Sequence, residues 1–307
     1  MNKNWVLSKI ESISSDLKGR FSKGFSTRFA PTPSGYLHLG HFFSLYVIEK
    51  ICEKSAGALH LRIEDHDTQR SKPEYTKQII SDLKNLGFQF DAKRQNSVCT
   101  PPVLYQSKRK NTYEFYMKKL AEQNEIYLCS CSRKEISDRK KKLKAKFAYD
   151  SHCRGRYFDF KQCTNKGLAV RKKMSSVILV KKDSGFSGES SFRRQVYTTP
   201  EEEFGDIVIF DKDNNYSYQF CVVVDDIESN IDVVIRGEDI EPSTVKQAEL
   251  WQSLSSKAPP VYIHHPLITS EGEKLSKSKD APPLKDLLAQ GLNREEIEKL
   301  MWKWIDS

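Results

Sequence analysis

The sequence lacks the features that would place the protein in a membrane or outside the cell. No run approaches the ~18 consecutive apolar residues of a transmembrane helix, and the longest apolar run near the N-terminus is only Trp5–Leu7. A secretory signal needs a longer apolar stretch, and acidic Glu11 and Asp16 argue against an organellar transit sequence. We therefore predict a cytoplasmic protein with no membrane partner, and we interpret residues 1–26 as an extension outside the main fold.

The sequence also lacks internal repeats, low-complexity tracts and an excess of acidic residues, and its cysteines are odd in number. Its seven cysteines, without a signal sequence, indicate reduced thiols. Lys and Arg number 50 against 41 Asp and Glu, a formal net charge of +9, which favours nucleic acid over a membrane as polyanionic partner. At 307 residues the chain is long enough for one large α/β domain or two smaller ones.

Strand and helix patterns alternate in the first part of the chain. Strands are expected at 26–30 and 57–65, and helices at 41–55 and 72–87. Pro73 suits the first turn of the second helix, and Gly87 suits its end. This alternation predicts the opening of a doubly wound α/β domain with a parallel, Rossmann-type sheet.

The middle of the chain, 99–218, is richer in charge, turns and clustered cysteines. Strand character returns at 218–228 and 231–240, followed by a helix at 243–254 and a strand at 260–268. We predict a nucleotide-binding domain in two halves, separated by an inserted α+β subdomain and followed by one or two short helices. The expected ranges are 27–98 and 219–278 for the halves, 99–218 for the insert and 279–307 for the C-terminal segment.

The segment "RFAPTPSGYLHLGH", residues 28–41, combines a tight turn with a helix start. A helix N-terminus points free backbone amides into the turn, an arrangement that binds phosphate. His38 and His41 lie three residues apart, so both rings project near that start and can donate hydrogen bonds to phosphate oxygens. A motif as short as H-x-G-H occurs often by chance. The alternative is that the two histidines cap the helix or fill one of its faces.

The segment "GEKLSKSKD", residues 272–280, is a second polar loop. Lys274 and Lys277 place two ammonium groups where they can meet a polyphosphate, although a solvated charge run is the alternative. Taken together and in this order, "HLGH" and "KLSKS" resemble the HIGH and KMSKS signatures of class I aminoacyl-tRNA synthetases.

Five ordered motifs narrow the resemblance. "RFAPTPSGYLHLGH", "LRIEDHDTQRS", "VVVDDIE", "VIRGEDI" and "KLSKS" resemble the glutamyl-tRNA synthetase catalytic domain. The resemblance implies that ATP, with Mg²⁺, activates L-glutamate to an adenylate, which is then transferred to an RNA hydroxyl. It implies an ATP site with His38, Gly40, His41, Lys274 and Lys277, in which His38, His41 and Lys277 act on the phosphates.

Glutamate has two carboxylates and one ammonium group, so its pocket needs paired arginines and a carboxylate. Arg28 and Arg236 sit at expected strand ends, where α/β proteins bind ligands. By the resemblance these arginines anchor the substrate carboxylates and Glu64 takes the amino group, although Glu64 could also pair with Arg62 or Arg70. The remaining residues expected in the pocket are Phe29, Ala30, Pro31, Thr32 and Tyr218.

The segment 129–153 carries a cysteine pattern suited to a metal. Cys129, Cys131 and Cys153 offer three soft ligands for tetrahedral Zn²⁺, and the alternative is three buried free thiols. The fourth ligand could be Tyr149 or His152, of which general metal chemistry favours the histidine. The spacing C-x-C, then Y-x-x-x-C, resembles the zinc site of one branch of the family, which implies Tyr149 and a structural Zn²⁺.

Between the cysteines, residues 139–146 read "RKKKLKAK". Such a basic stretch can hold an RNA backbone without reading its sequence, or it can be a solvated loop. The sequence does not decide between the two.

After "KLSKS" only 279–307 remain, too few for an anticodon-reading domain of ~100 residues. Short chains of this kind resemble glutamyl-Q tRNA(Asp) synthetases, which attach glutamate to queuosine in the anticodon loop of tRNA(Asp). This implies tRNA(Asp) bearing queuosine as partner and a monomer. The alternatives are a shortened glutamyl-tRNA synthetase charging a 3′ end and a catalytically silent relative that binds RNA.

Overall fold

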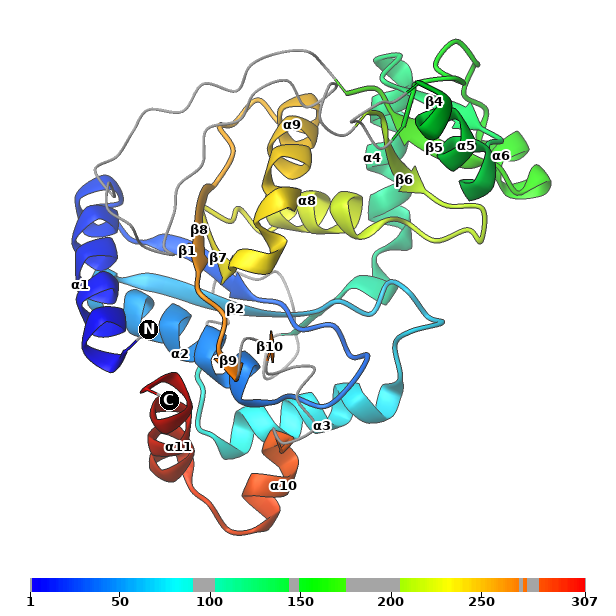
Figure 1. The fold of residues 1–307 in the computed structure, drawn as a ribbon. Helices are drawn as coiled ribbons and strands as arrows, with labels where there is room; N and C mark the ends of the chain where they lie inside the picture. Colours follow the sequence, from blue (N-terminus) through cyan, green and yellow to red (C-terminus); the bar gives the residue numbers. More distant parts are fainter. Residues whose placement is uncertain are drawn as a thin grey trace.

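A parallel sheet forms the centre of the molecule (Figure 1). The computed structural model describes residues 2–90, 103–143, 149–174, 205–270, 273–274 and 282–306. The parallel strands are β1 (Phe25–Phe29), β2 (Gly57–Ile63) and β3 (Val103–Tyr105), and the parallel pair β7 (Val233–Gly237) and β8 (Val261–His265). β7 lies beside β1, where the backbone N–H of Asp232 donates to the carbonyl of Ser26 at 3.0 Å. The order β3-β2-β1-β7-β8 confirms the predicted doubly wound, Rossmann-type architecture.

The helices predicted in the two halves are present. α2 (Leu39–Ser55) follows β1, α3 (Pro73–Asn85) follows β2, and η2 (Glu238–Ser243) leads from β7 into α9 (Thr244–Leu254). Pro73 begins α3, as expected, and Gly87 adopts φ +71° just beyond the end of that helix, a conformation that favours glycine.

The N-terminal residues are part of the main fold, contrary to the prediction for 1–26. They form α1 (Lys3–Arg20), which lies against α2, and β1 already begins at Phe25. Its apolar face buries Val6, Ile10 and Ile13 in the same core as the sheet. These residues recur every three to four positions, so they form one stripe of a helix that must be covered.

The segment 218–228 is a helix, α8 (Tyr218–Glu228), and the predicted strand is wrong here. Three consecutive valines, Val222–Val224, favour a strand by local preference. In the fold, Phe220, Val223 and Val224 instead belong to a second hydrophobic core. The adjacent Asp225 and Asp226 are also buried, and each forms an ion pair with an arginine. Tertiary packing therefore overrides the weak preference of the valines.

The insert is an antiparallel sheet flanked by helices, at the upper right of Figure 1. Its elements are α4 (Lys110–Glu122), β4 (Ile126–Cys129), α5 (Arg133–Leu143), α6 (Phe160–Lys166), β5 (Ala169–Lys172) and β6 (Ile207–Phe210). The second core joins the insert to α8 and α9. β3 falls inside the expected range 99–218 but pairs with β2, so the insert begins after β3 and the short η1 (Gln106–Lys108).

The C-terminal segment contains the short helices that the sequence predicts. α10 (Leu284–Ala289) contacts α3, and α11 (Arg294–Asp306) packs on α1 and α2. Before them, β9 (Thr269–Ser270) and β10 (Glu273–Lys274) form a two-stranded antiparallel ladder. Across the residues that the structure describes, every helix is too short or too polar to traverse a bilayer.

Candidate active site and cysteine cluster

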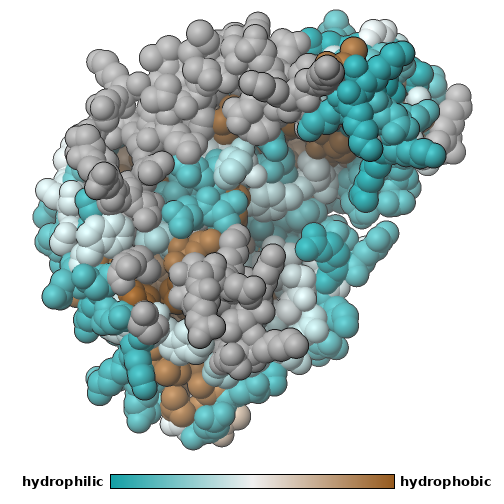
Figure 2. All heavy atoms as spheres, viewed as in Figure 1, coloured by the Kyte–Doolittle hydropathy of each residue, from teal (hydrophilic) through white to brown (hydrophobic). Residues whose placement is uncertain are grey.

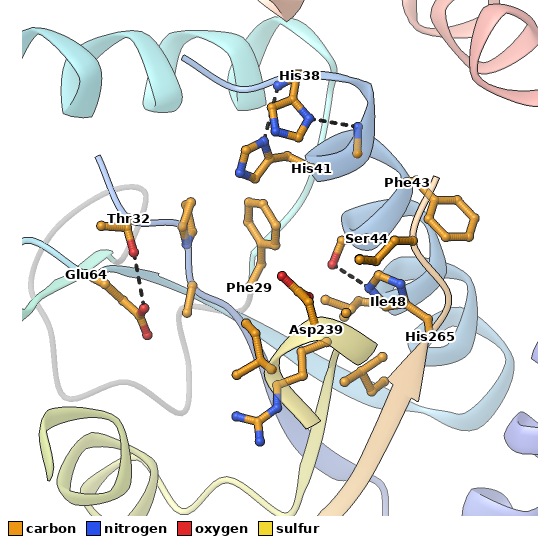
Figure 3. A pocket seen from close by; sticks show the side chains of 18 of the residues that line it. Phe29, Thr32, His38, His41, Phe43, Ser44, Ile48, Glu64, Asp239 and His265 are labelled. Carbon is orange, nitrogen blue, oxygen red and sulfur yellow. Dashed lines mark hydrogen bonds between the residues drawn. The ribbon is translucent and has the colours of Figure 1, made fainter. Parts of the chain in front are cut away.

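A pocket of about 370 Å³ lies where β1, β2 and β7 end and α2 begins (Figure 3). This is the sheet edge at which doubly wound proteins bind ligands. The expected residues that line it are Arg28, Phe29, Ala30, Pro31, Thr32, His38, Gly40, His41, Glu64, Tyr218 and Arg236. Lys274 belongs to β10, and Lys277 lies outside the described residues.

The two histidines cap the start of α2, as one reading of the sequence held. His38 Nδ1 accepts a hydrogen bond from the Gly40 backbone N–H at 3.0 Å, and His41 Nδ1 accepts from the His38 backbone N–H at 3.3 Å. Because both Nδ1 atoms accept, a neutral ring carries its proton on Nε2. The cap therefore leaves each Nε2–H to donate to a ligand, and capping and phosphate binding are compatible.

Burial keeps this histidine pair neutral. It lowers the pKa of His38, and burial together with the neighbouring His38 lowers the pKa of His41 to about 3. The ring centroids lie 3.9 Å apart. A Cβ on Gly40 would come within 2.9 Å of His38 Cε1, so glycine at this position lets the His38 ring fold over the helix start.

A buried carboxylate, Asp226 on α8, binds two arginines, of which Arg28 lines the pocket. It accepts from Arg28 Nε at 3.1 Å and from Arg62 Nη1 at 2.6 Å. Burial alone would raise the pKa of Asp226, but the charges of Arg28 and Arg62 lower it below its ordinary value. Asp226 therefore stays ionised and fixes the position of Arg28 at the pocket wall.

Glu64 faces the pocket from the end of β2. Arg62 Nη2 lies 3.6 Å from Glu64 Oε1, and Thr32 Oγ1 donates to Oε2 at 3.5 Å (Figure 3). Burial raises the pKa of Glu64 to about 7, although the charges of Arg62 and Arg28 oppose the shift. The ion pair with Arg62 was one of the two expected roles of Glu64, and the long distances leave this carboxylate suited to bind a ligand cation as well.

Arg236 is held by three side chains, none of which is a carboxylate. Its Nη1 donates to Gln247 Oε1 and its Nη2 to Thr244 Oγ1, both at 2.7 Å, while Nε donates to His264 Nε2 at 3.3 Å. No carboxylate is among these three partners, so none of them cancels the positive charge of Arg236. It is therefore suited to attract a ligand carboxylate.

Asp225, the neighbour of Asp226 on α8, is completely buried and faces the insert. It accepts from Arg109 Nε at 2.6 Å, Gln106 Nε2 at 2.7 Å and Tyr113 Oη at 2.9 Å. Consecutive helix residues point about 100° apart, so one turn of α8 binds Arg28 and Arg62 with one carboxylate and the start of α4 with the next.

Sequence reasoning missed several residues of the pocket wall, among them Ser44, Asp239 and His265. Two signals could have found Ser44 and His265. Ser44 follows His41 by three positions on the same helix face, and His265 ends the parallel strand β8 as Phe29, next to Arg28, ends β1.

The cysteines expected to bind metal lie together in the insert. Cys131 Sγ is 3.5 Å from Cys153 Sγ, and the three Sγ atoms of Cys129, Cys131 and Cys153 all lie within 4.8 Å of one another. Tyr149 Oη lies 3.5 Å from Cys129 Sγ and 3.8 Å from Cys131 Sγ. Ligands of tetrahedral Zn²⁺ are about 3–4 Å apart, since Zn–S bonds measure about 2.3 Å, so these four side chains fit the ion.

The surroundings of the cluster include two arginines and the buried Tyr149. Arg171 donates to Cys129 Sγ at 3.3 Å, and Arg139 donates to Cys131 Sγ at 3.2 Å. His152 is exposed, whereas Tyr149 is buried. Gly205, at φ +64°, passes so close that a Cβ would meet the Tyr149 carbonyl oxygen at 2.1 Å.

The described part of the basic stretch, 139–143, belongs to α5, which buries no side chain. Figure 2 shows a largely hydrophilic surface over this region at the upper right. Arg139 is committed to Asp150 at 2.6 Å. Residues 144–146 lie outside the described residues.

The chain also matches a known family of proteins. Residues 25–300 match the family described as tRNA synthetases class I (E and Q), catalytic domain. Because the match covers most of the chain, the protein belongs to this family.

Curated relatives make the likeness more particular. The chain is 33% identical to glutamate–tRNA ligase 1 of Helicobacter pylori strain HPAG1 over 290 residues, 91% of this chain and 58% of that protein. It is 33% identical to glutamate–tRNA ligase 2 of Helicobacter acinonychis strain Sheeba over 291 residues, with coverage of 92% and 58%. The chain thus spans somewhat more than half the length of these relatives.

A solved structure confirms the fold. A glutamate tRNA ligase from Elizabethkingia meningosepticum CCUG26117, in complex with its amino acid, superposes with a TM-score of 0.62 at 24% identity. The superposition covers 87% of this chain and 53% of that chain.

Proposed function

We propose that the pocket activates L-glutamate with ATP to form glutamyl-adenylate. One observation carries the proposal: cationic Arg28 and Arg236 and the carboxyl group of Glu64 line the same pocket as the histidine-capped start of α2. The two arginines match the two substrate carboxylates, and Glu64 matches the ammonium group. The two Nε2–H groups of His38 and His41 match phosphate oxygens.

In this mechanism a substrate carboxylate attacks the α-phosphorus of ATP and pyrophosphate leaves. Neutral His38 and His41 donate from Nε2 to the oxygens on which charge builds, so their contribution is greatest in the transition state. Lys274 and Lys277 act on the phosphates by their resemblance to the family motif, and Mg²⁺ bound with ATP neutralises phosphate charge. Arg28, positioned by Asp226, orients glutamate for attack.

For the acceptor we propose queuosine in the anticodon loop of tRNA(Asp). Its support is the arrangement of Cys129, Cys131, Tyr149 and Cys153, whose spacing resembles the branch of the family with this activity. The names of the curated relatives favour a second candidate, the 3′ end of tRNA(Glu).

Labelled glutamate and ATP, incubated with separated tRNAs, test the acceptor. We expect label on tRNA(Asp) carrying queuosine and none on the same tRNA made without queuosine. Label on tRNA(Glu), released by treatment that removes the 3′ nucleoside, would instead establish the second candidate.

The activation of glutamate is tested separately from its transfer to RNA. Glutamate-dependent exchange of pyrophosphate into ATP is expected from the wild type and not from Arg28→Ala or Arg236→Ala. A wild type without exchange, in the presence and absence of tRNA, would contradict activation and favour a silent RNA-binding relative.

We further propose one structural Zn²⁺ held by Cys129, Cys131, Cys153 and Tyr149. Four protein ligands leave no open coordination position, so the ion would stabilise the insert rather than react. Metal analysis should find about one Zn²⁺ per chain in the wild type and in His152→Ala, and a reduced content in Tyr149→Phe. Unchanged zinc in Tyr149→Phe would remove the tyrosine from the ligand set.

A further inference from the structure

The pocket has three chemically different walls (Figure 3). Glu64 and Thr32 form a polar wall, and His38 and His41 form the start of α2. The third wall lies across the pocket from Glu64 and contains Ser44, Ile48 and His265. Glu64, assigned above to glutamate, and His38 and His41, assigned to phosphate, lie on the first two walls, and none of these three belongs to the third.

The third wall is apolar apart from one polar pair. Phe43, Ile48 and Ile268 are buried and line it, and the Phe43 ring meets the His265 ring edge to face at a centroid distance of 5.3 Å. Ser44 Oγ and His265 Nε2 lie 2.9 Å apart within this surface. A flat, largely apolar ligand group with a few hydrogen-bonding atoms suits such a wall.

The direction of the hydrogen bonds can be assigned. The carbonyl oxygen of Pro266 only accepts, so His265 Nδ1, 2.9 Å away, must donate to it. Burial lowers the pKa of His265 to about 4, so its Nε2 carries no proton at neutral pH. Nε2 therefore accepts the hydroxyl hydrogen of Ser44, and the Ser44 oxygen is left with lone pairs, which can only accept from a ligand.

We propose that Ser44 Oγ accepts a hydrogen bond from a donor on the nucleoside of ATP, and that His265 positions it by fixing the hydroxyl hydrogen. This rests on the proposed function, which places ATP in this pocket, and adds a residue that selects among nucleotides. Two donors of adenosine have the required chemistry, the exocyclic amine of the base and a ribose hydroxyl. Both present N–H or O–H to an acceptor, whereas a keto oxygen at the base would repel it.

Binding of Mg²⁺–ATP, measured by calorimetry, and pyrophosphate exchange test the proposal. In Ser44→Ala we expect the Kd and KM for ATP to rise about 5- to 10-fold, the loss expected for one neutral hydrogen bond, with kcat nearly unchanged. Ser44→Thr keeps the hydroxyl and should restore most of the affinity. Ser55→Ala removes a hydroxyl from the same helix outside the pocket, where Ser55 donates only to the Ile51 carbonyl, and should match the wild type.

Nucleotide analogues identify the donor. If the base amine donates, wild type discriminates against ITP and Ser44→Ala loses this discrimination. If the ribose donates, the same loss appears with 2′-deoxy- or 3′-deoxy-ATP. An unchanged Kd for ATP in Ser44→Ala, or an equal rise for ATP and all three analogues, would overturn the proposal.

The role of His265 is tested by a double-mutant cycle. His265→Asn is too short to reach Ser44 and should weaken ATP binding, whereas His265→Gln can present an acceptor there and should restore it. In the Ser44→Ala background His265→Asn should have no further effect on the Kd, since it acts through the serine. Additive effects would show that His265 does not position Ser44.

The two proposals fail differently. Absence of glutamate-dependent exchange in the wild type would contradict activation, while the Kd of ATP would still report on Ser44. Normal exchange with an unchanged Kd in Ser44→Ala would contradict only this inference.

Discussion

At the scale of single residues, the pocket contains ionisable groups that respond differently to pH. The pKa of His41 is lowered to about 3 by burial and by His38, and that of Glu64 is raised to about 7 by burial. The histidine therefore stays neutral between pH 5 and 8, whereas Glu64 changes its charge in this range. The difference makes Glu64 accessible to a simple measurement.

We predict that glutamate binding strengthens as pH rises from about 6 to 8, because Glu64 must lose its proton to pair with the substrate ammonium. The KM for glutamate in pyrophosphate exchange should fall through this range with an apparent pKa near 7 in the free protein. Glu64→Gln should bind glutamate weakly and without this pH dependence. A wild-type KM that is flat across the range would contradict the assignment.

The same group affects stability with a definite sign. The folded protein holds the Glu64 proton more tightly than the unfolded chain, in which the pKa of a glutamate is 4.5. Ionisation is therefore costly when folded, and the stabilising contribution of the protonated form is lost as pH rises from 4.5 to about 7. Glu64→Gln should gain stability relative to wild type over that interval in urea unfolding.

Gly40 offers a prediction about geometry. Alanine there would place Cβ 2.9 Å from His38 Cε1 and push the ring from the helix start. We expect Gly40→Ala to lower kcat for exchange by about 10²-fold, since small displacements of groups near the reacting atoms have effects of this size. Gly19→Ala, where no atom lies within 4 Å of the added carbon, is the control. Wild-type kcat in Gly40→Ala would show that the ring position is unimportant.

Single residues also show how far the sequence can reach. The spacing of His38 and His41 and the strand-end positions of Arg28 and Arg236 predicted pocket residues, because these patterns are local. Asp226 was not identified as the partner of Arg28, 198 positions away, because that contact depends on how α8 packs. Ser44 and His265 were missed for the same reason, since they come from elements 221 positions apart.

At the scale of elements, α1 and α8 depart from expectation for opposite reasons. α1 begins a chain whose recognised motifs start later, and it was therefore set aside although its apolar residues have helical spacing. α8 has strand-favouring residues but is helical, since its apolar side chains fill a core and its acidic ones bind arginines. The position of the recognised motifs gave a wrong expectation for α1, and the strand preference of the valines gave a wrong expectation for α8.

The packing of α1 predicts a large effect from a residue outside the matched family segment. Ile10 is completely buried, so Ile10→Ala should lower the free energy of unfolding by ~2–5 kcal/mol through lost burial and a cavity. Ser8→Ala, at an exposed position of the same helix, should change it by less than ~0.5 kcal/mol. Equal stability of Ile10→Ala and Ser8→Ala would contradict the packing of α1 on the core.

At the scale of the whole molecule, the pocket and the cysteine cluster belong to different cores. The sheet and α1, α2, α10 and α11 build the first, and Cys129, Tyr149 and Cys153 lie in a small cluster within the insert. None of the described residues in that cluster lines the pocket. Loss of the cysteine cluster should therefore leave activation of glutamate largely intact.

We predict that Cys153→Ser loses most bound zinc and becomes more sensitive to protease within the insert, while glutamate-dependent pyrophosphate exchange stays within about threefold of wild type. Transfer of glutamate to RNA should fall more, because the insert carries the cysteine pattern on which the proposed RNA acceptor rests. Zinc content by mass spectrometry and exchange rates on the same sample test this. Loss of exchange in proportion to zinc would show that the two parts are coupled.

The architecture as a whole was predictable from alternating strands, helices and ordered motifs. The exact extent of the insert was not, because β3 is only three residues long and is recognised by its pairing with β2. The role of α8, whose adjacent carboxylates bind Arg28 and Arg109, was also hidden, since it depends on contacts between distant segments.

The adjacent carboxylates of α8 set a constraint on redesign. Removing the insert to make a minimal activating enzyme would delete Arg109 and Tyr113, and Asp225 would remain buried without these partners. An excised domain of this kind should require Asp225→Asn or an apolar replacement before it folds, while Asp226 must be kept for Arg28. The same constraint applies when inserts are exchanged between relatives. Arg109 and Tyr113 would have to be transplanted together with Asp225.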